Sequence, residues 1–146
     1  MQRLASLLIA LAACSSPASS ARPHNAASPP PKPAVNTDLV LIVSNQSFAI
    51  TPIDLVVKID GVTMIDGKYS VDGQHTFTPH TLHLAAGTHT LEARTVAGRA
   101  VLTKTFELAP DKRYATLMYW FYPKTHYEPT PEHFSFDQYA QQPMFD

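Results

Sequence analysis

Histidine is the residue type that could give this chain of 146 residues a chemical activity, because it occurs seven times. Its ring is the commonest metal ligand in proteins, and its ordinary pKa lies near neutral pH. Metal binding would require several rings to converge on one point, and four histidines lie close together in the sequence. These four are His75, His80, His83 and His89.

The spacing of these histidines argues against a shared metal site. Successive side chains of a strand point to opposite faces, so His80 and His83 are predicted to face apart. His75 and His83 share a face, but the extended chain between them would span about 26 Å. A metal site at His75, His80 or His83 is therefore only an alternative, and we expect no cofactor.

The leucines that flank the last of these histidines predict a hairpin and its register. Pairing Leu82 with Leu91 keeps both on one face, whereas a slip by one residue would turn one strand's apolar set outward. In that register His89 lies opposite Leu84 and faces inward near the turn, where its ring can bond to the backbone. His83 then faces solvent.

Sequence motifs that carry catalysis are absent from the chain. It contains no Gly-x-Ser-x-Gly nucleophile elbow, no His-Glu-x-x-His metal motif and no glycine-rich phosphate loop. The formal net charge of -1 leaves no basic excess to neutralise phosphates, so nucleic acid is not an expected partner. We expect a protein that is not an enzyme.

The only cysteine, Cys14, ends a short apolar run at the N-terminus. Arg3 supplies a positive start, and the run is about half as long as a membrane-spanning helix, which is the plan of a secretory signal. The residues L-A-A-C at positions 11–14 resemble the lipobox of bacterial lipoproteins. The resemblance implies cleavage before Cys14 and attachment of a diacylglyceryl group to its sulfur.

Lipidation predicts a protein of the bacterial cell envelope, held in a membrane by its acyl chains. Two or three chains give a stable anchor, whereas one alone binds marginally. Ser15 after the cysteine resembles the outer-membrane sorting pattern, so we expect the outer membrane, facing the periplasm or the surface. The alternative is a soluble secreted protein, cleaved near Ala21, whose cysteine has no role.

Composition divides the chain into four parts. Residues 1–13 are predicted as the lipoprotein signal, and residues 14–37 as a disordered tether of Ser, Ala and Pro that acts as a spacer. Residues 38–122 are predicted as the folded domain. Residues 123–146 are expected to form an aromatic and proline-rich tail that packs on it, with a partner-binding strip as the alternative.

Alternating apolar residues predict an all-β domain. Leu55, Val57 and Ile59 indicate the core face of one strand. Short strands at intervals of about ten residues predict a single antiparallel β-sandwich, immunoglobulin-like in form, with about seven strands. We expect these strands at residues 39–43, 54–60, 74–84, 89–95, 99–108, 113–122 and, as an edge strand, 133–136.

Turns and one apolar strand refine this prediction. Three Asp-Gly pairs, at residues 60–61, 66–67 and 72–73, predict tight turns between strands. The strand at residues 113–122 is apolar on both faces, which indicates a central position or an outer face covered by the tail. Trp120 lies in this run, so we expect it in the core rather than in a sugar-binding platform.

Two segments resemble the core of PEGA-like repeats. They are V-K-I-D-G at residues 57–61 and the stretch T-P-H-T-L-H-L-A-A-G-T-H-T-L at residues 78–91. The P-E-G-A tetrapeptide itself is absent. The resemblance implies a small β-sandwich on a bacterial envelope protein, with a role in surface or cell-wall interaction and no catalysis.

These observations lead to one functional expectation and two alternatives. We expect a membrane-anchored envelope lipoprotein whose β-sandwich is a non-catalytic interaction or structural module, with an envelope protein or peptidoglycan as partner. The first alternative is a domain that binds cell-wall glycan or carbohydrate through aromatic rings of the tail, and the second is a metal-binding protein. The candidate ligand-binding residues of the tail are Tyr127, Phe134, Phe136 and Tyr139.

Overall fold

The structure is a computed structural model that describes residues 36–145, apart from 72, 74, 98 and 124–127. The predicted signal, the predicted lipidation site Cys14, most of the predicted tether and the candidate Tyr127 lie outside the described residues. Throughout the described part, no helix is present that could span a membrane.

All of the regular secondary structure in the described residues is β-strand, as the sequence predicts. The eight strands are β1 (Asn36–Asn45), β2 (Ile53–Ile59), β3 (Val62–Tyr69), β4 (Phe77–Ala85), β5 (Gly87–Thr95), β6 (Val101–Leu108), β7 (Arg113–Tyr122) and β8 (Thr130–Tyr139).

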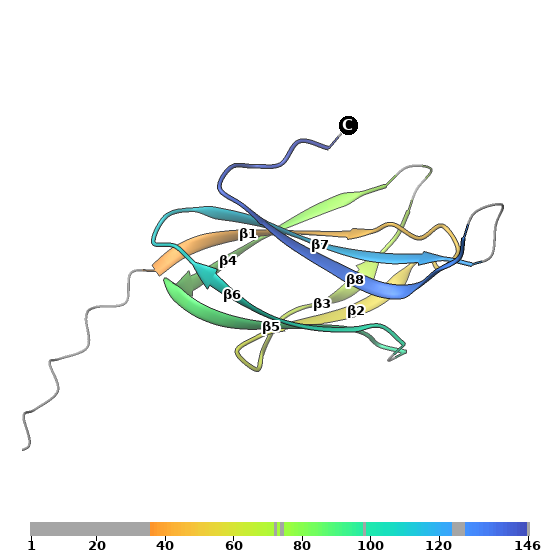
Figure 1. Ribbon diagram of the computed structural model, residues 1–146, viewed down its shortest axis with the longest axis horizontal. Coiled ribbons are helices and arrows are strands. Elements are labelled where there is room, and N and C mark those ends of the chain that lie inside the picture. The colour runs from red at the N-terminus through yellow and green to blue at the C-terminus, as the bar shows by residue number, and fades with distance from the viewer. Residues whose placement is uncertain (1–35, 72, 74, 98, 124–127, 146) are drawn as a thin grey trace, which may run out of the picture. The chain divides into compact units, whose positions relative to one another are not determined.

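The strands form two sheets that pack face to face (Figure 1). Sheet A has the order β4-β1-β7-β8, and sheet B has the order β3-β2-β5-β6. The predicted β-sandwich is therefore confirmed. The expected edge strand at residues 133–136 lies within β8, which pairs with β7 along one side of sheet A.

One strand pair departs from the expected antiparallel arrangement. β1 and β7 run parallel, from Leu39 opposite Arg113 to Asn45 opposite Tyr119. A parallel pair needs a long crossover connection. Here the crossover passes through sheet B, because β2, β3, β5 and β6 lie in that sheet and β4 returns to sheet A between them.

The sequence-based prediction also omitted one strand, β3. It assigned a turn to Asp66-Gly67, but both residues lie inside β3, where Gly67 is opposite Leu55. The turn at Asp60-Gly61 is confirmed: φ is 51° at Asp60 and 79° at Gly61, and Ile59 pairs with Val62 across it. These positive φ values fit a type I′ hairpin turn, which asparagine, aspartate and glycine favour.

The predicted hairpin between β4 and β5 is wrong. β4 pairs with β1 in sheet A, and β5 pairs with β2 and β6 in sheet B, so the connection at Ala86 crosses between the sheets. The predicted inward direction of the leucines is correct, because Leu82 is 7% exposed and Leu91 is fully buried. Both leucines can be buried whether their strands pair in one sheet or lie in opposite sheets, so their burial does not distinguish the two topologies.

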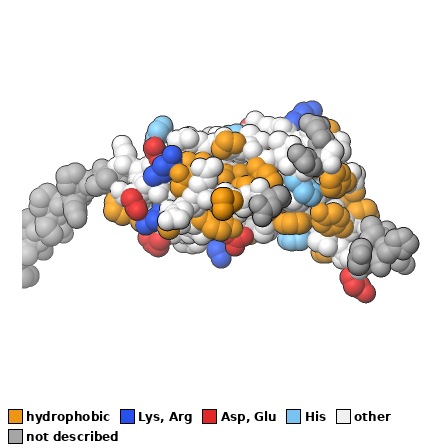
Figure 2. Space-filling model, turned by 90° about the horizontal axis from the view of Figure 1, so that it is seen from above, with side chains coloured by type: hydrophobic (Ala, Val, Ile, Leu, Met, Phe, Trp, Pro, Cys, Tyr) orange, Lys and Arg blue, Asp and Glu red, His pale blue; other side chains and the backbone are white. Residues whose placement is uncertain are grey.

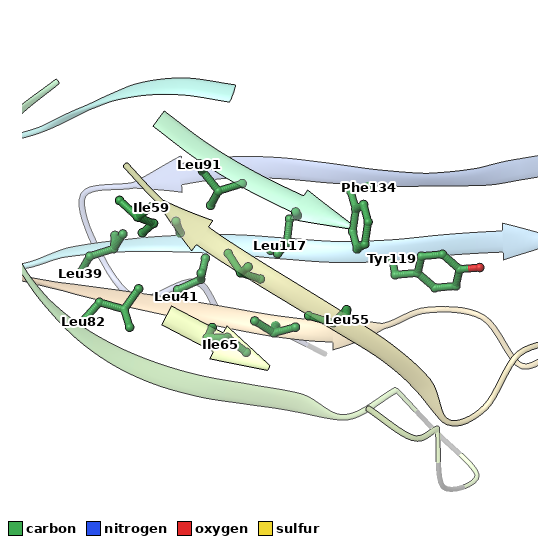
Figure 3. Packing of buried hydrophobic residues seen from close by; sticks show 14 of the residues in the cluster. Leu39, Leu41, Leu55, Ile59, Ile65, Leu82, Leu91, Leu117, Tyr119 and Phe134 are labelled. Atoms are coloured by element: carbon green, nitrogen blue, oxygen red, sulfur yellow. The ribbon is translucent and has the colours of Figure 1, made fainter. Parts of the chain in front are cut away.

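The core lies between the two sheets (Figure 3). Alternate residues of both layers point into it, and the predicted core face of β2 is confirmed, with Leu55 and Val57 fully buried. Tyr119 and Phe134 pack edge to face at one end, with ring centroids 5.6 Å apart. Because the inward side chains pack in this way, each strand has a defined inner and outer face. The polar side chains at the strand ends are positioned accordingly.

Candidate functional site

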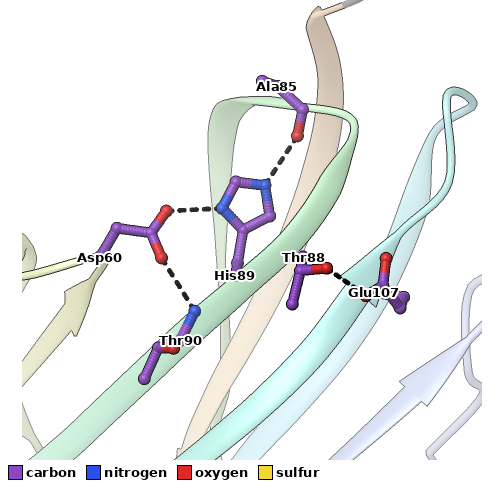
Figure 4. A network of polar contacts seen from close by, with 6 residues as sticks. All are labelled: Asp60, Ala85, Thr88, His89, Thr90 and Glu107. Atoms are coloured by element: carbon purple, nitrogen blue, oxygen red, sulfur yellow. Dashed lines mark hydrogen bonds and ion pairs between the residues drawn. The ribbon is translucent and has the colours of Figure 1, made fainter. Parts of the chain in front are cut away.

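The best-defined polar site is centred on His89, at the start of β5 (Figure 4). Its Nδ1 lies 2.6 Å from Oδ2 of Asp60, and its Nε2 lies 2.7 Å from the carbonyl oxygen of Ala85. The second oxygen of Asp60 accepts the backbone N–H of Thr90 at 2.8 Å. A carboxylate and a carbonyl both accept, so the ring fits this site as an imidazolium that donates from both nitrogens.

Two opposing influences determine the pKa of His89. Burial alone would lower it, but the bonds to Asp60 and Ala85 and the negative charges of Asp60 and Glu107 raise the pKa overall. The N–H of Thr90 and the ring of His89 hold the pKa of Asp60 below its ordinary value. Both shifts favour the charged form of each partner.

This arrangement links the two sheets rather than offering a reactive group. Asp60 follows β2 and His89 begins β5, both in sheet B, whereas Ala85 ends β4 in sheet A. The sequence correctly predicted that His89 faces inward and bonds to the backbone. It did not predict Asp60 as the partner, because the assumed β4–β5 hairpin hid the pairing of Ile59 with Leu91 that brings Asp60 to His89.

The metal-site candidates His80 and His83 point to opposite faces of β4, as predicted. His80 lies opposite Leu41 on the inner side, and its Nε2 is 2.8 Å from the hydroxyl of Tyr69. Burial lowers the pKa of His80. His83 is exposed and its Nδ1 is 2.7 Å from Oδ1 of Asp38.

The third candidate, His75, lies in the segment before β4 and packs against Phe48, with ring centroids 5.1 Å apart. Each of the three histidines thus has its own neighbours. In the part of the chain that the structure describes, no group of three or more His, Cys, Asp or Glu side chains is placed to hold a metal ion.

Two of the ligand-binding candidates in the tail point into the sandwich. Phe134 is 6% exposed, and Phe136 is half-buried with its ring centroid 5.5 Å from that of Phe106. Tyr139 lies on the other face of β8, opposite Tyr114, and is 37% exposed. Of these three candidates, Tyr139 therefore lies on the outer side of sheet A, whereas Phe134 and Phe136 face the core.

The outer side of sheet A carries several partly exposed apolar side chains, called here the aromatic face: Tyr114, Met118, Trp120, Tyr122 and Tyr139. The expectation that Trp120 lies in the core is wrong. The alternate residues Leu117 and Tyr119 occupy the core side of β7, so Trp120 points outward and is half-buried. The central position predicted for this strand is confirmed, because β7 lies between β1 and β8.

Hydrogen bonds hold the aromatic face in place. Trp120 Nε1 donates to Oγ of Ser135 at 3.0 Å, and the hydroxyl of Tyr122 donates to the carbonyl of Gln46 at 2.7 Å. The ring centroids of Trp120 and Tyr122 are 6.4 Å apart. Figure 2 looks down on this side of the molecule and shows hydrophobic side chains gathered across it.

The end of the described chain lies on the same side of sheet A. Phe145 stacks on Phe77, with ring centroids 3.9 Å apart and planes at 7°. Val40 and Ile42 also point away from the core, yet they are only 9% and 5% exposed. The outer side of sheet A is therefore partly covered near β1 and β4 and more open along β7 and β8.

No protein-family model matches the chain, and no curated protein matches it.

Proposed function

We propose that the protein is a bacterial envelope lipoprotein, held in a membrane by lipid on Cys14, whose β-sandwich is a non-catalytic interaction module. The aromatic face carries the proposal. Its partner is a protein of the envelope that buries the open part of this face along β7 and β8.

The sequence supports the anchor, and the packing supports the contact surface. The L-A-A-C pattern and the Ser/Ala/Pro-rich tether precede β1, which begins at Asn36. Aromatic side chains supply large contact area and lose little conformational entropy on binding, which is why they are common at interfaces. Trp120 and Tyr122 are already held by hydrogen bonds, so little ordering remains for a partner to impose.

The hydrogen bonding of the pair formed by His89 and Asp60 supports a structural role for this pair. Both nitrogens of His89 and both oxygens of Asp60 have partners within the fold. A general base needs a free lone pair directed at a substrate. The charge of this pair thus stabilises the connection between sheets A and B.

Site-specific photocrosslinking in intact envelopes tests the contact surface. A photoreactive residue in place of Met118 reports on the aromatic face, and one in place of the exposed Thr103 reports on the outer side of sheet B. We expect a discrete protein adduct from position 118, lost on Trp120→Ala, and none from position 103. Equal adduct patterns from both positions, or none from position 118, would contradict the proposal.

A glycan of the cell wall is the second candidate for this surface. The observation that favours it is the outward position of Trp120 beside Tyr122 on sheet A, an arrangement in which rings can stack on sugar faces. Co-sedimentation with purified peptidoglycan and a glycan panel tests this alternative. Binding that Trp120→Ala weakens would support it, and failure with every glycan would remove it.

A further inference from the structure

A cavity of about 340 Å³, called here the end cavity, lies at one end of the sandwich. It is lined by the start of β2 and by the connection between β5 and β6. This is the end where Asn45 pairs with Tyr119, whereas Asn36, which follows the tether, lies opposite Ala85 at the other end (Figure 1). Pockets for small ligands begin at about 300 Å³. The cavity is thus large enough for a small molecule and faces away from the point where the tether joins.

Hydrogen bonds hold the walls of this end cavity. The fully buried Asn45 donates from Nδ2 to the carbonyl of Ile50 at 2.8 Å, and the N–H of Val96 donates to the carbonyl of Asp54 at 3.0 Å. These bonds join the segment after β1, β2 and the β5–β6 turn. The apolar wall includes Ile50, Pro52, Val96 and Ala97.

Arg99, whose side chain is 61% exposed, supplies a positive charge at the cavity, and two contacts hold it there. Its backbone N–H donates to Oγ1 of the fully buried Thr95 at 3.2 Å, and its Nε lies 3.0 Å from Oε1 of Glu132. Among the described residues, Glu132 is the one carboxylate that pairs with Arg99. Because this pair engages Nε, the two Nη groups remain suited to a second, bidentate carboxylate.

A buried polar cluster lies behind Arg99. The side chain of Glu132 is only 11% exposed, and its Oε2 has no hydrogen-bond partner among the described residues. The hydroxyl of the fully buried Tyr119 also has no hydrogen-bond partner at normal distance and angle among the described residues. Burial, together with the neighbouring carboxylate of Glu132 as acceptor and as negative charge, raises the pKa of Tyr119. Buried groups without partners are uncommon in folded proteins. The contact of the other carboxylate oxygen of Glu132, Oε1, with Nε holds Arg99 at the cavity.

A carboxylate lines the same cavity. Asp54 pairs with Lys68 only loosely, at 3.7 Å; the side chain of Lys68 is largely exposed and that of Asp54 is about half-exposed. The end cavity therefore combines a guanidinium, a carboxylate and an apolar wall. The complementary ligand carries a carboxylate and an ammonium group on a short apolar body.

We propose that the end cavity binds a zwitterionic amino acid or short peptide, with its carboxylate on Arg99 and its ammonium group directed to Asp54. This site is separate from the aromatic face and goes beyond the proposed function. It requires no particular partner on sheet A.

Titration of the full-length protein in detergent micelles with alanylalanine tests the site. The readout is the nuclear magnetic resonance signal of the methyl groups of Ile50 and Val96, which report on the apolar wall. We expect saturable shifts with alanylalanine. Affinity should fall about tenfold for alanylalanine amide, which lacks the carboxylate, and also for acetyl-alanylalanine, which lacks the ammonium group. This ligand series needs no substitution, so it decides the question even if a variant fails to fold.

Three variants then assign the contacts. Arg99→Gln should weaken binding of alanylalanine about tenfold and abolish the advantage of the acid over the amide. Asp54→Asn should remove the advantage of the free amine. The control Arg113→Gln, whose guanidinium pairs with Asp111 at the other end of β7, should bind as the parent does. Unchanged methyl signals, or equal binding of acid and amide, would overturn the proposal even if the aromatic face proves to bind a partner.

Discussion

Two histidine–aspartate pairs of nearly equal length allow a direct measurement of what burial contributes to this fold. His89 and Asp60 are 2.6 Å apart, and His83 and Asp38 are 2.7 Å apart. The side chain of His89 is 9% exposed and that of His83 is 76% exposed. Replacing each histidine by alanine therefore removes a similar contact from two different environments.

The expected losses follow from that difference in burial. A hydrogen bond to a charged group contributes about 1.5 to 3 kcal/mol, and a buried partner left unpaired adds to the loss. Water can still reach Asp60, whose side chain is half-exposed, so we expect His89→Ala to lower the free energy of unfolding by about 2 to 3 kcal/mol. For His83→Ala we expect about 0 to 1 kcal/mol, as for other exposed pairs.

The pH dependence of the same variant gives an independent check. The pKa of His89 is raised in the folded protein, so its stabilising contribution is complete below the unfolded pKa of about 6.5 and is lost as the pH rises through the folded pKa. The stability difference between the parent and His89→Ala should therefore shrink above about pH 6.5. Urea unfolding at several pH values measures it, and equal losses for the two histidines, or a difference that grows with pH, would refute the reasoning.

Three further predictions concern the anchor, the turn and the core. Cys14→Ala should release the protein from membranes and abolish fatty-acid labelling, which membrane fractionation and metabolic labelling measure. Gly61→Ala should destabilise by about 1 kcal/mol because its φ is 79°, whereas Gly67→Ala should be nearly neutral because an added Cβ makes only ordinary contacts; urea unfolding that ranks them equally would contradict this. Leu91→Ala, at a fully buried site, should cost about 3 to 5 kcal/mol, and Val101→Ala, at 67% exposure, less than about 0.5 kcal/mol in thermal unfolding.

The sequence predicts the sandwich because burial follows simple periods, and it fails where pairing depends on distant strands. The period of two in β2 identified Leu55 and Val57 as core residues, and both are fully buried. The same rule could not show that Leu82 and Leu91 belong to different sheets, since both leucines point inward in either topology. Propensity at Asp66-Gly67 also favoured a turn, but pairing with β2 keeps these residues in a strand.

The candidate sites depend on the same long-range pairing. Asp60 and His89 meet because β2 pairs with β5. Arg99, in the connection between β5 and β6 of sheet B, meets Glu132 on β8 of sheet A. No local motif connects either pair, so spacing in the sequence gives no signal for them. The sequence predicted the tight turn at Asp60 and the inward direction of His89, but not that these two side chains meet.

The central position of β1 connects the predicted anchor with the proposed contact surface. β1 is apolar on both faces, with Leu41 fully buried in the core and Ile42 at 5% exposure on the outer side, because it pairs with β4 on one edge and β7 on the other. A partner bound at Trp120 would pull on β7, whose hydrogen bonds pass the load directly to β1. A pull on the predicted tether would act along β1, whose whole length is paired, so several backbone hydrogen bonds would resist together. A tether joined to an edge strand would load fewer such bonds, and the two-faced apolar pattern of residues 39–43 is the sequence feature that permits the central position.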